Sequence, residues 1–124
     1  MMKTKDISNK SQTPRRVVMV IYPDAHILDV VGPLEVLTGA KLFLPDNVQP
    51  YEVHVVAHDT GAIQTTSGLT LIADQNFADA EKDDRPIDTL IISGGHGTVK
   101  ALEDLELLSF VSTVSKQADR IVSI

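Results

Sequence analysis

The chain of 124 residues contains no cysteine and no tryptophan, and aromatic residues make up only 4% of it. The absence of cysteine excludes a disulfide framework, a thiolate zinc site, an iron–sulfur cluster and a cysteine nucleophile within these residues. No apolar run approaches the ~20 residues that a transmembrane helix needs, so we expect no membrane contact. The N-terminal residues lack the apolar core of a secretory signal, so we expect a cytoplasmic protein.

Hydrophobic residues make up 43% of the chain and charged residues 23%, which favours a folded domain over intrinsic disorder. The formal net charge of −6 is unevenly distributed, because residues 1–16 carry five basic side chains and one acidic side chain. The remaining body is therefore strongly acidic and repels phosphates, so we expect no nucleic acid to bind through this chain. We predict a disordered basic tail at residues 1–15 and a single domain at residues 16–124.

Apolar strands and amphipathic helices alternate along the body of the chain. Apolar runs predict buried strands at residues 17–22 and 88–92, and further strands are predicted at 51–57 and 120–124. A β-hairpin is predicted at 63–72, with its turn at Ser67 and Gly68. A short helix is expected near residues 77–80. This order of elements predicts an α/β fold with a mostly parallel sheet.

Two longer helices are predicted from apolar residues at helical spacing. The first lies within residues 27–40, where Pro33 either begins the helix or kinks a helix that starts near Ala25. The second follows Thr98, which we expect to cap it. Its predicted buried face comprises Leu105, Leu108, Val111, Val114 and Ala118.

Candidate functional residues lie at the carboxyl ends of the predicted strands, where parallel sheets bind ligands. Gly94 and Gly95 follow strand 88–92, and their amides either bind an anion or only form a tight turn. Asp29 lies in an apolar stretch, where a carboxylate suits proton transfer or merely stabilises a helix start. His26 and His96 also lie at strand ends, as pocket residues or as solvated side chains.

We predict no metal site and no cofactor. His54 and His58 are four residues apart, but His54 lies in a predicted strand, where this spacing does not bring two ligands together. Neither a dinucleotide-binding G-x-G-x-x-G motif nor a P-loop is present, and the G-x-S-x-G motif of serine hydrolases is also absent.

Four segments together resemble the ThiJ/PfpI family, which has the class I glutamine amidotransferase-like fold. They are residues 17–37 with the pattern L-D-x-x-G-P-x-E-V, and residues 63–74, 87–97 and 118–124. The similarity covers about residues 16–124 and extends to two subgroups. One is the N-terminal domain of GlxA-like AraC-family transcription regulators, and the other is the isonitrile hydratase-like enzymes. The resemblance implies a flavodoxin-like, doubly wound, mostly parallel sheet.

The resemblance also assigns roles to residues. Asp29 matches the acidic residue after the first strand, and Gly94 and Gly95, followed by His96, match a glycine loop that stabilises negative charge. The family's nucleophile, usually cysteine, would stand one position beyond Ile124. We therefore expect an incomplete domain, truncated before the nucleophile elbow, that has no catalytic activity by itself.

Three functions follow from this resemblance. The leading hypothesis is a ligand-sensing domain of an AraC-type transcription regulator, separated from its DNA-binding domain. The alternative is the N-terminal part of an isonitrile hydratase-like, cysteine-dependent enzyme in which Asp29 is the acid/base partner. A third is a degenerate domain that serves only in association. We expect a small-molecule ligand at Gly94, Gly95, His96 and His26, and a homodimer.

Overall fold

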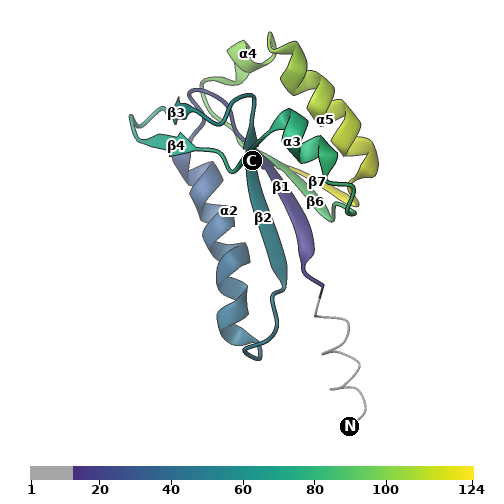
Figure 1. Ribbon diagram of the computed structural model, residues 1–124. Helices are drawn as coiled ribbons and strands as arrows, with labels where there is room; N and C mark the ends of the chain where they lie inside the picture. The colour runs from purple at the N-terminus through teal and green to yellow at the C-terminus, as the bar shows by residue number, and fades with distance from the viewer. Residues whose placement is uncertain (1–12) are drawn as a thin grey trace.

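The computed structural model describes residues 13–124 and has a five-stranded parallel sheet at its centre (Figure 1). The strand order is β5-β2-β1-β6-β7. Every pairing in this sheet is parallel, as the alternation of strands and helices predicts. The strands are β1 (Arg15–Val20), β2 (Tyr51–Ala57), β5 (Gln75–Asn76), β6 (Thr89–Ile92) and β7 (Arg120–Ser123). The predicted α/β, flavodoxin-like fold is confirmed.

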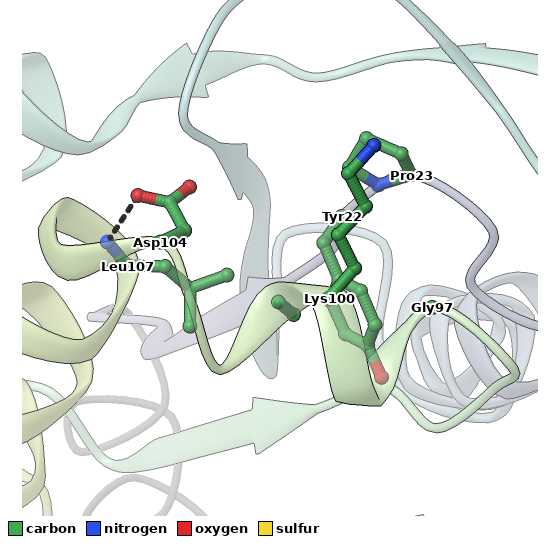
Figure 2. Close-up of a pocket in the computed structure, with 7 residues that line it drawn as sticks. Tyr22, Pro23, Gly97, Lys100, Asp104 and Leu107 are labelled. Carbon is green, nitrogen blue, oxygen red and sulfur yellow. Dashed lines mark hydrogen bonds between the residues drawn. The ribbon is translucent and has the colours of Figure 1, made fainter.

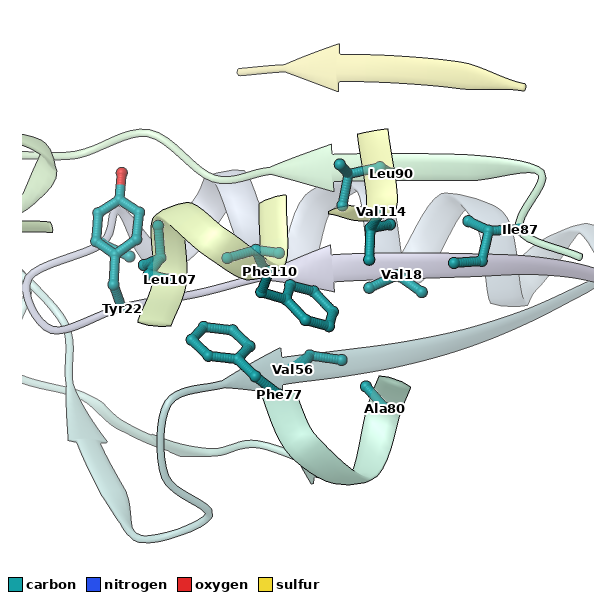
Figure 3. Packing of buried hydrophobic residues seen from close by; sticks show 12 residues of the cluster. Val18, Tyr22, Val56, Phe77, Ala80, Ile87, Leu90, Leu107, Phe110 and Val114 are labelled. Atoms are coloured by element: carbon teal, nitrogen blue, oxygen red, sulfur yellow. The ribbon is translucent and has the colours of Figure 1, made fainter. Parts of the chain in front are cut away.

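Helices cover both faces of the sheet (Figure 1). Helix α2 (Ile27–Gly39) packs on one face, followed by the short 3₁₀ helix η1 (Ala40–Phe43). Helices α3 (Phe77–Lys82) and α5 (Leu105–Gln117) pack on the other face, and α4 (Thr98–Ala101) precedes α5. On the α3–α5 side the rings of Phe77 and Phe110 stack with centroids 4.7 Å apart (Figure 3). Two apolar layers, one on each side of β1, therefore hold the domain together.

The predicted hairpin forms outside the main sheet. Strands β3 (Ala62–Gln64) and β4 (Thr70–Ile72) pair antiparallel, and Gly68 in the connecting turn has a φ of 91°. That left-handed conformation favours glycine, which explains the turn at Ser67 and Gly68. In Figure 1 the hairpin lies beyond the N-terminal end of α2.

Helix α2 runs without interruption through Pro33, so the second alternative for this segment is the observed one. The helix begins at Ile27, with His26 at the N-cap position in an extended conformation. Because proline has no N–H, Pro33 cannot donate to the carbonyl of Asp29, four residues earlier. The carbonyl of Asp29 therefore lacks the usual hydrogen bond from the residue four positions later.

The segment after Thr98 differs from its prediction. Two helices form instead of one, and Thr98 is the first residue of α4, with its hydroxyl donating to the carbonyl of Gly95. Asp104 caps α5 by accepting from the N–H groups of Glu106 and Leu107. The buried face of α5 is formed by Leu107, Phe110 and Val114, whereas the side chain of Leu105 is 78% exposed. The predicted face was right for Val111, Val114 and Ala118, which pack on the core, and wrong for Leu105 and Leu108, which are exposed.

Strand β1 begins at Arg15, the last residue of the predicted tail, and the rest of that prediction falls mostly on residues 1–12, outside the described part. Arg16, the first residue of the predicted domain, has a buried side chain. Its guanidinium donates to the carbonyls of Ala80, Asp83 and Arg85. This side chain therefore joins the start of β1 to the segment after α3. Among the helices of residues 13–124, none has both the length and the apolar character that a membrane span requires.

Strand β7 lies at one end of the sheet with much of its surface exposed. Ile121 is 56% and Val122 is 37% exposed. Beside it, side chains of α2, β6 and β7 line a groove of about 460 Å³ on the α2 face. The sheet in this structure is thus less covered over β6 and β7 than over β1 and β2.

Candidate functional site

The strand order brings the predicted site residues to one edge of the sheet. Strands β1, β6 and β7 are neighbours and run in parallel, so their carboxyl ends lie side by side. The loop at residues 21–26 follows β1, and the glycine loop at residues 93–97 follows β6. Ile124 follows β7. Segments distant in sequence therefore meet where a parallel sheet binds its ligands.

Asp29 contacts the glycine loop directly. The N–H of Gly94 donates to Oδ2 of Asp29 at 3.2 Å, and the carbonyl of Gly94 accepts from the N–H of His26 at 2.9 Å. Nδ1 of His26 lies 3.9 Å from the same carboxylate oxygen of Asp29, whose side chain is 22% exposed. The start of α2 and the loop after β6 are thereby joined through both the backbone and a carboxylate.

Glycine is required in this loop because the backbone passes very close to its neighbours. A Cβ on Gly95, whose φ is 137°, would stand 2.6 Å from the N atom of His26. A Cβ on Gly94 would meet the carbonyl oxygen of Ile124 and would stand 2.9 Å from Oδ2 of Asp29. The end of β7 therefore lies against the same carboxylate and the same glycine.

The two histidines of the site lie together. The rings of His26 and His96 meet edge to face with centroids 5.2 Å apart. His26 has a half-exposed side chain, and His96 is exposed. All five predicted site residues are thus gathered at one place, while their roles in binding or catalysis stay predictions.

Tyr22 fixes the two loops against each other. Its hydroxyl donates to the carbonyl of Ser93 at 2.6 Å and lies 2.9 Å from Oγ1 of Thr98. Figure 2 shows the Tyr22 ring beside α4 in a pocket of about 150 Å³ that Lys100, Asp104 and Leu107 also line. The buried Tyr22, which the sequence pattern did not indicate, therefore fixes the loop after β1 against the loop after β6.

The hairpin tip also reaches the site, which the sequence did not reveal. Thr66 donates its N–H to the carbonyl of Ala25 at 3.1 Å and its hydroxyl to the carbonyl of Asp24 at 2.9 Å. Thr66 and Ser67 consequently line an open pocket of about 330 Å³ together with residues 26–29. The turn residues predicted the hairpin itself, but no local signal shows which loop its tip contacts.

His54 and His58 do not come together on a common ligand. His54 lies beside Glu52 in β2, whereas His58 contacts Asp104 at 2.8 Å and Glu106 at 3.0 Å. The hydrogen bond with Asp104 raises the pKa of His58 above its ordinary value. Burial acts in the opposite direction on Asp104, but its hydrogen bonds with His58 and with backbone N–H groups hold the pKa of this carboxyl below the usual range. This cluster ties the β2–β3 loop to the N-terminus of α5.

The arrangement can bind a small polar molecule with groups of three kinds. Asp29 supplies a carboxylate whose position is set by the Gly94 amide. Among residues 13–124, the N–H of Gly95 has no hydrogen-bond acceptor, so it is free to donate to a negatively charged or carbonyl oxygen. The imidazoles of His26 and His96 stand beside both groups. A carboxylate, a free amide and two imidazoles thus face one edge of the sheet.

Known proteins are similar to this chain in sequence or in architecture. The isonitrile hydratase of Pseudomonas putida is 28% identical over 109 residues, which are 88% of this chain and 42% of the hydratase. A ThiJ/PfpI family protein from Pseudomonas syringae has a crystal structure with a TM-score of 0.73 and 24% identity, covering 90% of this chain and 42% of that one. Oxidized DJ-1 of Toxoplasma gondii matches with a TM-score of 0.69 and 20% identity, covering 88% of this chain and 54% of that one.

The chain therefore spans 42% to 54% of the length of these three relatives. The profile of the DJ-1/PfpI family matches residues 15–124, which is nearly the whole described chain. The mostly parallel sheet with helices on both faces agrees with that match. This chain belongs to the DJ-1/PfpI family.

Proposed function

We propose that this chain is a small-molecule-binding domain whose ligand lies beside Asp29 and the Gly94–Gly95 loop. The observation that carries the proposal is the hydrogen bond between the Gly94 N–H and Oδ2 of Asp29, which joins two segments at the carboxyl edge of the sheet. An open pocket adjoins this carboxylate. The chain itself holds no cysteine, which favours binding over thiol chemistry within these residues.

A screen of small fragments against the ¹⁵N-labelled chain tests this proposal. Binding fragments should shift the amide resonances of His26, Asp29, Gly94 and Gly95, and Asp29→Asn should weaken them. The matched control is the exposed Asp84→Asn, which should leave binding unchanged. Fragments that bind only in the groove beside β7, or equal binding by Asp29→Asn, would contradict the proposal.

The role of such a domain in an AraC-type regulator, and its homodimeric state, stay predictions that rest on the motif resemblance. The coding sequence beyond codon 124 tests the first. A basic helix-turn-helix domain encoded there would support the regulator, and its absence would count against it. Size-exclusion chromatography with light scattering tests the dimer directly, with a monomer across the micromolar range as the contrary result.

A second candidate is the acid-bearing half of a thiol-dependent enzyme, and two observations favour it. One is the similarity to an isonitrile hydratase over most of this chain. The other is the position of the Ile124 carbonyl against Gly94 and near Asp29, so that a residue following β7 in a longer chain would enter beside the carboxylate. In that site Asp29 would exchange protons with the thiol or the substrate, and the Gly95 N–H would stabilise developing negative charge.

Hydration of a simple alkyl isonitrile to the N-alkylformamide is the assay for this candidate. The chain of 124 residues should show no thiol-dependent turnover. A longer chain with a cysteine after residue 124 should be active, and Asp29→Asn should lower its rate by about 10²-fold or more. Turnover by the 124 residues alone, or an Asp29→Asn variant with full activity, would reject this assignment.

A further inference from the structure

The pocket beside Asp29 has a wall that the hairpin tip provides. It is lined on one side by His26, Ile27, Leu28 and Asp29 at the start of α2, and on the other by Thr66 and Ser67. The proposed function places a ligand here without saying what its chemistry is. The hydrogen-bond donors and acceptors of the lining residues indicate which chemical class of ligand fits. The location of the ligand rests on the proposed function.

The hydroxyl groups of Thr66 and Ser67, at the hairpin tip, both donate their hydrogens within the protein. A hydroxyl carries one hydrogen and two acceptor lone pairs. Thr66 donates its hydrogen to the carbonyl of Asp24 at 2.9 Å. Thr65 donates its own to the carbonyl of Leu69 at 2.7 Å, so Ser67, whose Oγ lies 3.1 Å from Oγ1 of Thr65, has to donate to Thr65. Thr66 and Ser67 therefore offer only acceptor oxygens to the pocket.

The carboxylate of Asp29 adds a third acceptor and a negative charge. One of its oxygens accepts from the Gly94 N–H, and the other has no such partner within residues 13–124. His26 is the one lining side chain with a hydrogen to donate when neutral, and its Nδ1 already lies 3.9 Å from Asp29. The polar lining is thus rich in acceptors and negative in charge, which repels carboxylates and phosphates and favours a cation with N–H donors.

The apolar residues that line the pocket indicate that the ligand also has a hydrocarbon part. Ile27 is partly exposed, and the Leu28 side chain is 75% exposed, so both can cover a short hydrocarbon chain. A primary ammonium group has three N–H donors, which equals the number of acceptor groups from Asp29, Thr66 and Ser67. We propose that the pocket binds a small primary amine as its ammonium ion, with a short alkyl chain against Ile27 and Leu28.

Four probes of similar size test this proposal on the ¹⁵N-labelled chain: n-butylammonium, butyltrimethylammonium, N-butylacetamide and butyrate. We expect n-butylammonium to bind with a dissociation constant on the order of 1 mM, and to shift the amide resonances of Asp29, Thr66 and Ser67. The trimethylated cation keeps the charge but lacks N–H donors, and the amide keeps a donor but lacks the charge. Each should bind at least about tenfold more weakly, and butyrate more weakly still.

Variants distinguish binding in the pocket from nonspecific binding to the rest of the acidic surface. Asp29→Asn should weaken n-butylammonium binding by about tenfold and Ser67→Ala by about threefold, while the exposed controls Asp84→Asn and Ser109→Ala leave it unchanged. Dispersed amide spectra establish that each variant is folded. If Asp29→Asn does not fold, the binding of n-butylammonium by Ser67→Ala tests the proposal instead. Binding of butyltrimethylammonium, the amide or butyrate as tight as that of n-butylammonium overturns the proposal, as does n-butylammonium binding that neither variant weakens.

The failure of this inference is distinguishable from the failure of the proposed function. If other fragments bind beside Asp29 and n-butylammonium does not, the ligand class is wrong and the binding site stands. If no molecule of any class shifts resonances at Asp29 or Gly94, the proposed binding site is wrong as well.

Discussion

Substituting Gly95 with alanine should destabilise the domain by about 2–6 kcal/mol, because two separate costs act at this position. Its φ of 137° is a conformation that an L-residue adopts at a cost of about 1–3 kcal/mol. The new Cβ would also stand 2.6 Å from the N atom of His26 and 2.7 Å from the carbonyl oxygen of Asp24. Both neighbours are backbone atoms, so relief requires moving the loop after β1, which adds about 1–3 kcal/mol.

Urea unfolding followed by circular dichroism measures this loss, and Gly39→Ala is the matched control. Gly39 ends α2 with a φ of −71°, and a Cβ there meets nothing within 4 Å. Alanine at residue 39 should therefore stabilise the domain by about 0.4–1 kcal/mol. A Gly95→Ala variant that loses less than about 1 kcal/mol would refute the reasoning, because neither the positive φ nor the close approach would then carry the expected cost.

Three further substitutions test the core, the buried arginine and the histidine cluster. Phe110→Ala removes a ring that is 1% exposed and stacked on Phe77, and should cost about 3–5 kcal/mol in urea unfolding; a loss below about 1 kcal/mol would contradict the packing described. Arg16→Met leaves three carbonyls without their donor and should cost about 2–4 kcal/mol, with a neutral result as the contrary outcome. His58 should titrate in NMR with a pKa above 6.5, because the folded state favours its charged form. The charged His58 then stabilises the fold fully below its unfolded pKa, and this stabilisation is lost as the pH rises through the folded pKa. His58→Gln should therefore remove that contribution from the pH dependence of the free energy of unfolding. An unchanged pH dependence would count against the contact with Asp104.

Much of the fold followed from local patterns in the chain. Continuous apolar runs identified β1 and β6, because a strand buried on both faces has no polar alternation. The β-branched and apolar residues of β2 and β7 also predicted strands, although the side chains of β7 are exposed. Strand ends then placed Asp29 and the glycine loop at one edge, since parallel neighbours end on the same side. The contact between Asp29 and Gly94 is consistent with that placement.

The parts that sequence alone did not reveal depend on contacts between distant segments. Leu107 and Phe110 of α5 are buried against the core in place of the expected Leu105 and Leu108, because they face Phe77 and the sheet. The burial of Arg16 depends on carbonyls more than 60 residues away. Likewise the hairpin tip reaches the site through hydrogen bonds from Thr66 to the loop after β1. Periodicity and turn propensity report on neighbours in sequence and carry no information about such partners.

The hydrogen bond between Asp29 and Gly94 has a consequence for how the protein folds. Its two partners are 65 residues apart in sequence, and β2 and the hairpin lie between them. Closing so long a loop is entropically costly, so the contact forms only after β6 has joined β1. During synthesis on the ribosome, Asp29 emerges well before Gly94 is made. The candidate site is accordingly a late product of folding, and the Gly94 amide resonance reports the completed native topology.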